Sequence, residues 1–128
     1  MRIIENVLTD RGSKYAVSGA EVADMDGIQA FLKDLKRNKK FAKATHNSWA
    51  AILPDGPVKN DDGEAGAGMV ILRMLERDGV QGQVVCVTRW FGGKHLGGDR
   101  FRNVQEAVRV WLGARCLESS NLDKTQKR

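Results

Sequence analysis

The sequence predicts a single α/β (α+β) domain, a two-layer sandwich in which helices cover one face of one sheet. Three observations lead to this fold class. The length of 128 residues suits one hydrophobic core. The composition, with 41% hydrophobic and 29% charged residues, is close to that of ordinary globular domains. Segments with the two-residue period of strands alternate with segments of helical period, in the order β-β-α-β-α-β-α.

The N-terminal part of the chain predicts a hairpin, a helix and a third strand. Gly12 lies in a polar turn cluster between two apolar-rich segments, where glycine can adopt the positive φ of a tight turn. Asp26 and Gln29 resemble a capping box, and apolar residues follow them at helical spacing. The third strand ends at Pro54, because proline cannot donate a ladder hydrogen bond. The strands are predicted over 2–8, 14–20 and 44–53, and the helix over 26–37.

The rest of the chain predicts a long connection, a helix, a buried strand and a last helix. The connection from Pro54 to Gly68 holds four acids, four glycines and both prolines, and so long a connection is usually functional or mobile. The strand should be buried on both faces, because residues 84–87 are all apolar. Asp99 suits a helix start and Gly113 a helix end. The predicted ranges are helix 69–77, strand 83–91, helix 99–113, and a flexible tail over 119–128 that follows a domain spanning 1–118.

The sequence argues against several classes of protein. Its apolar runs are far shorter than the roughly 20 residues that cross a bilayer, so no membrane partner is expected. Residues 1–6 include acidic and polar side chains and begin no signal-peptide core, which predicts a cytoplasmic location. Cys86 and Cys116 have no companion ligand cluster, which favours buried free thiols over a disulfide framework or a zinc site.

The net charge of +5 is concentrated in one segment, since residues 33–43 carry six positive charges and one negative. Such a segment can attract phosphate backbones or an acidic protein surface, and it is also typical of the solvated end of an amphipathic helix. Both interpretations stay open, and no DNA sequence specificity is expected. The candidate contacts with RNA or a ribosome are Lys36, Arg37, Lys39, Lys40 and Lys43.

Three segments carry the candidate functional motifs: residues 44–47, 60–64 and 88–101. The first two flank one region of the chain, so their side chains could meet. A histidine among carboxylates could hold a divalent metal, but the spacing matches no metal loop and lacks the alternation of an EF-hand. We therefore expect no metal or other cofactor, and instead a network that pairs the carboxylates with Arg89, Arg100 or backbone amides.

The glycine pairs at 92–93 and 97–98 precede the last predicted helix. Their backbone N–H groups, with Lys94 and Arg100, could hold a phosphate at the helix N-terminus. The alternative is that the glycines make tight turns and close contacts that exclude a Cβ. No P-loop, dinucleotide pattern or nucleophile motif is present, so no catalytic residue is assigned. A small enzyme or nucleotide binder at this loop remains a further alternative.

Trp90 and Phe91 end the predicted buried strand beside Arg89. The two rings fit either of two interpretations. They can belong to the core, or they can form an aromatic and arginine anchor on the surface, as binding hot spots often do.

In these three segments the sequence resembles the IMPACT family, which is called the YigZ family in bacteria. The family pattern has a threonine-histidine-asparagine strand, a D-D-G-E loop, and a strand that ends in threonine or serine, arginine, two aromatics and two glycines. The matching residues are 44–47, 61–64 and 88–93, in the same order, and residues 96–101 resemble the eukaryotic branch. The resemblance covers about residues 10–112.

The resemblance implies the ribosomal protein S five second-domain-like fold, in agreement with the element order above. It also implies a role in translation. Eukaryotic members restrain the initiation-factor kinase during amino-acid starvation by competing for its ribosome-associated activator. That competition is attributed largely to an N-terminal RWD domain, which we do not expect here, and neither do we expect the C-terminal ferredoxin-like domain of bacterial members.

We therefore expect a non-enzymatic IMPACT-type module that acts in translation regulation or the stress response through a protein partner. An RNA- or ribosome-binding protein that uses residues 33–43 is the alternative from another class. The candidate pocket residues are His46, Asn47, Asp61, Asp62, Glu64, Arg89, Trp90, Lys94, Asp99 and Arg100.

Overall fold

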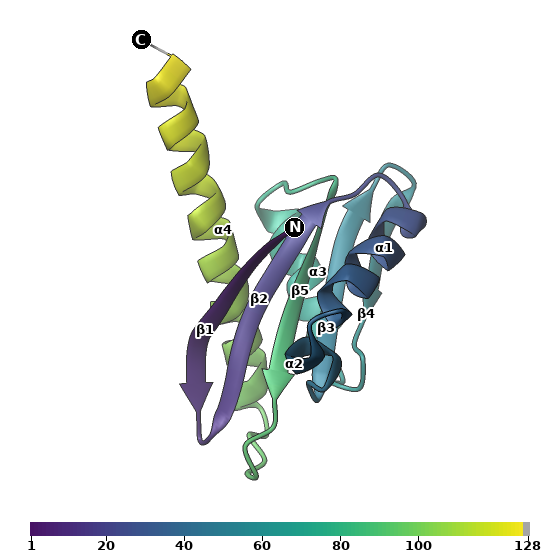
Figure 1. Cartoon of the computed structure of the whole chain (residues 1–128), viewed down its shortest axis with the longest axis vertical. Helices are drawn as coiled ribbons and strands as arrows, with labels where there is room; N and C mark the ends of the chain where they lie inside the picture. Colours follow the sequence, from purple (N-terminus) through teal and green to yellow (C-terminus); the bar gives the residue numbers. More distant parts are fainter. Residues whose placement is uncertain (127–128) are drawn as a thin grey trace.

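The computed structural model describes the backbone of residues 1–126 and the side chains of residues 1–117. Its strands form one sheet, and its helices pack against that sheet (Figure 1). The elements are β1 (Arg2–Asp10), β2 (Ser13–Glu21), α1 (Met25–Lys36), α2 (Lys39–Ala42), β3 (His46–Leu53), β4 (Gly56–Asn60), α3 (Ala67–Arg77), β5 (Gln83–Trp90) and α4 (Asp99–Gln126).

The sheet has five strands in the order β1-β2-β5-β3-β4, and every neighbouring pair is antiparallel. The last strand in chain order, β5, therefore lies between β2 and β3. Its Arg89 is the register partner of Tyr15 on one side and of His46 on the other. Because directly opposite residues point to the same face of a sheet, the register gathers these three side chains on one face.

Helices cover both faces of the sheet, so the expectation of a single covered face is wrong (Figure 1). One core joins the sheet to α3 and α4, and the other joins it to α1 and α2. The reason lies in β5, whose Val85 and Val87 belong to the first core while Val84 and Cys86 belong to the second. A strand that is apolar on both faces needs a helix layer on each face. The α+β class is confirmed, and so is the expected burial of β5 on both faces.

Two short elements were not predicted from the sequence patterns. The region after Pro54 was expected to be a connection without secondary structure, but it contains β4, which pairs with β3. The strand lies at the edge of the sheet, where Pro57 is tolerated because its missing N–H faces no neighbour. The single helical turn α2 follows Asn38, whose side chain accepts the N–H of Lys40.

The helix ends differ from their predicted positions in two places. Asp24, and not Asp26, caps α1 by accepting the N–H of Gly27 at 2.9 Å. The last helix does not end at Gly113, whose backbone stays helical, but continues to Gln126. Gly79, just past the end of α3, adopts positive φ, as is common for glycine at that position. The flexibility of residues 119–128 stays a prediction, because their side chains lie outside the described residues.

The cysteines are both free, but only Cys86 is buried, so the expectation of two buried thiols is wrong for the exposed Cys116. Burial raises the pKa of the Cys86 thiol to about 12. In the part of the chain that the structure describes, no helix is both long and apolar enough to cross a membrane.

Candidate functional site

A hollow of about 500 Å³ lies at the end of the sheet where β3 begins and β5 ends. The loop after β5 and the first turn of α4 close its other side. Four of the predicted site residues line it, and they come from four separate parts of the chain: His46, Glu64, Arg89 and Arg100. The structure therefore brings the three candidate motifs together at one place.

A buried ion pair forms the floor of this hollow. Nη1 of Arg89 donates to both carboxylate oxygens of Glu64, at 2.8 and 3.1 Å. The side chains of Glu64 and Arg89 are only 3% and 8% exposed. The hydroxyl of Ser13 lies 3.4 Å from the same guanidinium and also accepts the N–H of Gly92. The expected pairing of a motif carboxylate with Arg89 is thus present in the structure.

Two further basic side chains face Glu64. Nη1 of Arg100 lies 3.4 Å from Oε1, and Nε2 of His46 lies 3.5 Å from Oε2. The other ring nitrogen of His46 lies 2.8 Å from the carbonyl oxygen of Asp62. Because a carbonyl oxygen can only accept, this contact assigns the proton to Nδ1 of the histidine. Glu64 therefore ties together β3, β5 and α4.

Aromatic rings form the rim above the ion pair. Phe91 is 44% exposed, although it is a large apolar residue. Its ring lies 5.8 Å from the Arg89 guanidinium and 5.4 Å from the ring of His95. The guanidinium of Arg100 lies 4.6 Å from the ring centre of Phe101. The hollow thus combines buried charges with exposed aromatic surface.

Asp61 holds the loop before α3 and does not line the hollow. Its carboxylate accepts the N–H of Gly66 at 3.0 Å and that of Gly68 at 2.8 Å, and so caps the start of α3. The hydrogen bond from Gly66 is the main cause that lowers the pKa of the Asp61 carboxyl below its ordinary value of 3.8, although desolvation opposes it. The carbonyl of Asp61 accepts the Ser48 hydroxyl.

Asn47 and Asp62 also hold the backbone in place. The buried Asn47 side chain donates to the carbonyl of Phe41 and accepts from Thr88, so it joins α2 to β3 and β5. The Asp62 carboxylate accepts the backbone N–H of Asn47 at 2.7 Å. Neither residue lines the hollow, so their place in its predicted wall is wrong for a physical reason: their polar groups are used by the chain itself.

Three other predicted wall residues lie outside the hollow. Trp90 points toward α2, where its indole donates to the carbonyl of Lys40 and its ring contacts Phe41 edge-on. Asp99 forms ion pairs with Arg11 and Arg102. Lys94 is exposed. Successive strand residues point to opposite faces, and this alternation separates Trp90 from Arg89.

The glycines beside the hollow have different roles. A Cβ on Gly92 would lie 2.0 Å from the carbonyl carbon of Gly12, so here the close-contact interpretation is confirmed. Gly97 and Gly98 line the hollow, and a Cβ on either would meet nothing within 4 Å. Their backbone is therefore open to an approaching group.

Several lining residues were not predicted from the sequence. Phe91 lies outside the predicted wall, although the glycines that follow it in the sequence indicate that it stands at a strand end. Other lining residues have no motif that marks them: Thr45, His95, Leu96 and Phe101. Among the described residues, no group of three or more His, Cys, Asp or Glu side chains is placed to hold a metal ion.

The five basic residues Lys36, Arg37, Lys39, Lys40 and Lys43 form a second surface, and none of them lines the hollow. All five are exposed, and they lie at the end of α1 and along α2. Arg37 pairs with Asp34 at 3.5 Å, and Lys40 pairs with Glu5 at 2.6 Å. Nζ of Lys40 also lies 5.2 Å from the ring centre of Trp90.

Residues 11–112 match the family model of the Impact N-terminal domain. The chain belongs to the IMPACT family. It is 37% identical over 107 residues to the IMPACT homologue of Schizosaccharomyces pombe, a match that covers 80% of this chain and 38% of that protein. It is also 37% identical over 114 residues to the IMPACT homologue of Caenorhabditis elegans, which covers 83% and 44% of the two chains. The IMPACT-type domain described here thus spans about two fifths of the length of these curated relatives.

Two solved structures are similar to this chain. A crystal structure of a hypothetical protein superposes with a TM-score of 0.68 at 22% identity, over 84% of this chain and 59% of that one. The structure of the two-domain translational regulator Yih1 matches with a TM-score of 0.48 at 32% identity, over 80% and 42% of the chains. The first of these likenesses supports the α+β architecture.

Proposed function

We propose that this IMPACT-family domain is a non-enzymatic binding module that takes part in translation regulation, and that the hollow is its docking site for a protein partner. The observation that carries the proposal is the exposed ring of Phe91 above the buried pair of Arg89 and Glu64. Arginine and aromatic residues at the centre of a desolvated pocket are typical of binding hot spots. Family membership supports the link with translation and the stress response.

The chemistry of the hollow favours binding over catalysis. Both oxygens of Glu64 face cations of the protein itself, and the Thr45 hydroxyl accepts the N–H of Phe91. These contacts stiffen the floor and the loop instead of presenting a reactive group to a substrate. A rigid floor lowers the entropy lost when a partner docks.

The rim indicates what kind of partner segment would fit. Phe91 and Phe101 offer apolar surface beside the buried Leu96, while Arg100 is half-buried and can donate to a carboxylate or carbonyl oxygen of the partner. We therefore infer a peptide segment that inserts an apolar side chain and places an oxygen beside Arg100. Because Arg89 and Glu64 are buried, the rim supplies the contacts that the partner reaches first.

Purified domain immobilised on beads tests this proposal with cell extract and mass spectrometry of the bound proteins. Phe91→Ala and Arg100→Gln should each lose translation-associated proteins that the unsubstituted domain retains. Met25→Ala is the matched control, since Met25 is 40% exposed on α1, far along the chain from the hollow. Unchanged retention of those proteins by both rim variants would refute docking at the hollow.

We propose RNA or ribosome binding through the basic surface as the second candidate function. Lys36, Lys39 and Lys43 are exposed and make no ion pair with any described side chain. Cations that are not already paired within the protein are available to phosphates, and their binding releases counterions. The salt dependence of binding distinguishes this candidate from the docking site.

A further inference from the structure

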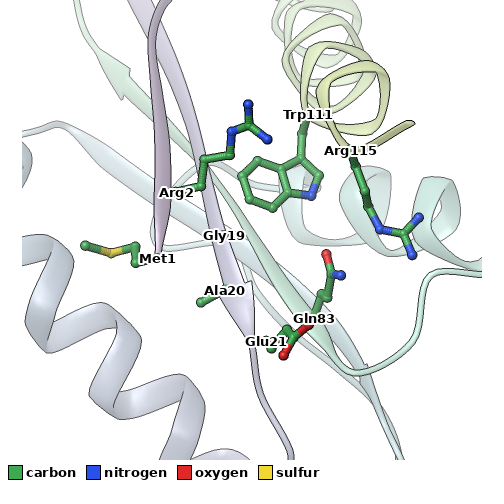
Figure 2. Close-up of a pocket in the computed structure, with 8 residues that line it drawn as sticks. All are labelled: Met1, Arg2, Gly19, Ala20, Glu21, Gln83, Trp111 and Arg115. Carbon is green, nitrogen blue, oxygen red and sulfur yellow. The ribbon is translucent and has the colours of Figure 1, made fainter. Parts of the chain in front are cut away.

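A second hollow, of about 400 Å³, lies at the opposite end of β5 from the docking site (Figure 2). It is lined where β1 and β5 begin, where β2 ends, and by the middle of α4. Its lining residues belong neither to the family motifs nor to the proposed docking site. Its polar groups are Arg2, Glu21, Gln83, Trp111 and Arg115.

The indole nitrogen of Trp111 is the unusual feature of this hollow. The residue is only 6% exposed, and its Nε1 is buried without a hydrogen-bond partner. The ring is held in this position by Gly19, where an added Cβ would lie 2.6 Å from the ring. A buried donor without an acceptor is costly, so an acceptor that reaches it gains more than it would at an exposed site.

A guanidinium lies on the side of the ring that carries this donor. The indole nitrogen lies on the side of the ring that faces Gln83 and Arg115, and Arg2 lies across the ring (Figure 2). Arg115 is half-buried and forms no hydrogen bond or ion pair with a described residue. Of the charged side chains that line the hollow, Arg115 is the cation on the indole-nitrogen side of the ring, and Glu21 is the acid.

We propose that this second hollow binds a carboxylate, the side chain of a glutamate or aspartate in a peptide, through Trp111 Nε1–H and the Arg115 guanidinium. Guanidinium and N–H donors together recognise a planar oxyanion. The Arg115 guanidinium offsets one negative charge, whereas a dianionic phosphate would bring a second negative charge close to Glu21. Gln83 and Arg115 are half-buried, long side chains, and their rotation would open the path to the indole.

Titration followed by ¹H–¹⁵N correlation spectra of the full chain tests the site directly. The probe is N-acetyl-glutamate amide at constant ionic strength, and Trp111→Phe assigns the Trp111 indole signal among those of the three tryptophans. The Trp111 signal should shift downfield and saturate with the probe, because its N–H gains an anionic acceptor. The isosteric N-acetyl-glutamine amide should leave the signal in place.

Arg115→Gln should weaken the apparent affinity at least several-fold, while Arg109→Gln, an exposed position on the same helix, should leave it unchanged. Backbone signals of each variant check that it is folded. No Trp111 shift with the glutamate probe would overturn the proposal, and so would equal losses in the two arginine variants. Inorganic phosphate is the comparison arm, and tighter binding of phosphate than of the carboxylate would overturn the assigned ligand class.

Discussion

Glu64 and Arg89 form a buried ion pair in which one guanidinium nitrogen contacts both carboxylate oxygens, at 2.8 and 3.1 Å. The pair connects the loop before α3 to the end of the central strand β5. Since Arg100 and His46 also face this carboxylate, the floor of the docking site depends on one buried negative charge. The first prediction concerns this charge.

Removing both partners of the pair should destabilise the domain by less than the sum of the two single removals. Glu64→Gln leaves Arg89 charged and buried, which costs about 3 to 5 kcal/mol of unfolding free energy. The double variant Glu64→Gln with Arg89→Met removes that uncompensated charge, so its loss should be clearly smaller than the sum of the two single losses. Urea unfolding of the four proteins measures this coupling, and additive losses would contradict it.

Asp61 should stabilise the fold in a pH-dependent way. Asp61→Ala removes both hydrogen bonds to the start of α3, and we expect a loss of about 1 to 2 kcal/mol at pH 7. The folded-state pKa of Asp61 is lowered, so its contribution is complete above about pH 5 and is lost as the pH falls through that lowered pKa.

Urea unfolding at a series of pH values from 7 to 2 checks the Asp61 prediction. The difference in unfolding free energy between Asp61→Ala and the unsubstituted chain should shrink as the pH falls. Asp55→Ala is the control, because Asp55 is exposed and makes no contact that holds a helix. A gap that stays constant with pH would show that the carboxylate charge does not act at α3.

Gly92 lies in the loop after β5 and packs against the hairpin between β1 and β2. This contact should leave no room for a side chain at Gly92. A Cβ there would lie 2.0 Å from the carbonyl carbon of Gly12, and both contacting groups are backbone. We expect Gly92→Ala to lower the unfolding free energy by at least about 3 kcal/mol, a loss typical of strained backbone. Gly98→Ala should be nearly neutral, since a Cβ there meets nothing within 4 Å. Thermal unfolding of the two variants measures the difference.

RNA affinity should depend on the basic surface and on salt. Changing Lys36, Arg37, Lys39 and Lys40 to Gln should weaken binding and reduce the slope of log affinity against log salt by about 3 to 4. The matched control removes the same charge from exposed arginines of α3 and α4: Arg73, Arg77, Arg102 and Arg109 to Gln. Filter binding or sedimentation over a salt series gives the slopes. Equal slopes for the two quadruple variants would place no RNA contact on α1 and α2.

The local patterns of the sequence determined most of the secondary structure. The alternation of apolar residues predicted β3, and the unbroken apolar run at 84–87 predicted β5. Helical spacing predicted α1, α3 and the first part of α4, and Gly12 marked the hairpin turn. These features depend on neighbours within a few residues, so a single sequence carries them. The edge strand β4 was missed because its proline and glycine are unusual in strands and are tolerated only at an edge.

Only the tertiary structure decided which polar residues share a site. The motifs suggested ten wall residues, and the register of β5 with β3 brought Arg89 beside His46 while it directed Trp90 to the other face. Glu64 reaches the same two side chains from the loop before α3. Asn47, Asp61 and Asp62 carry the same motifs, yet their polar groups bind the backbone. The sequence determines which polar groups are present, whereas the partner of each polar group is set by contacts between residues far apart in the chain.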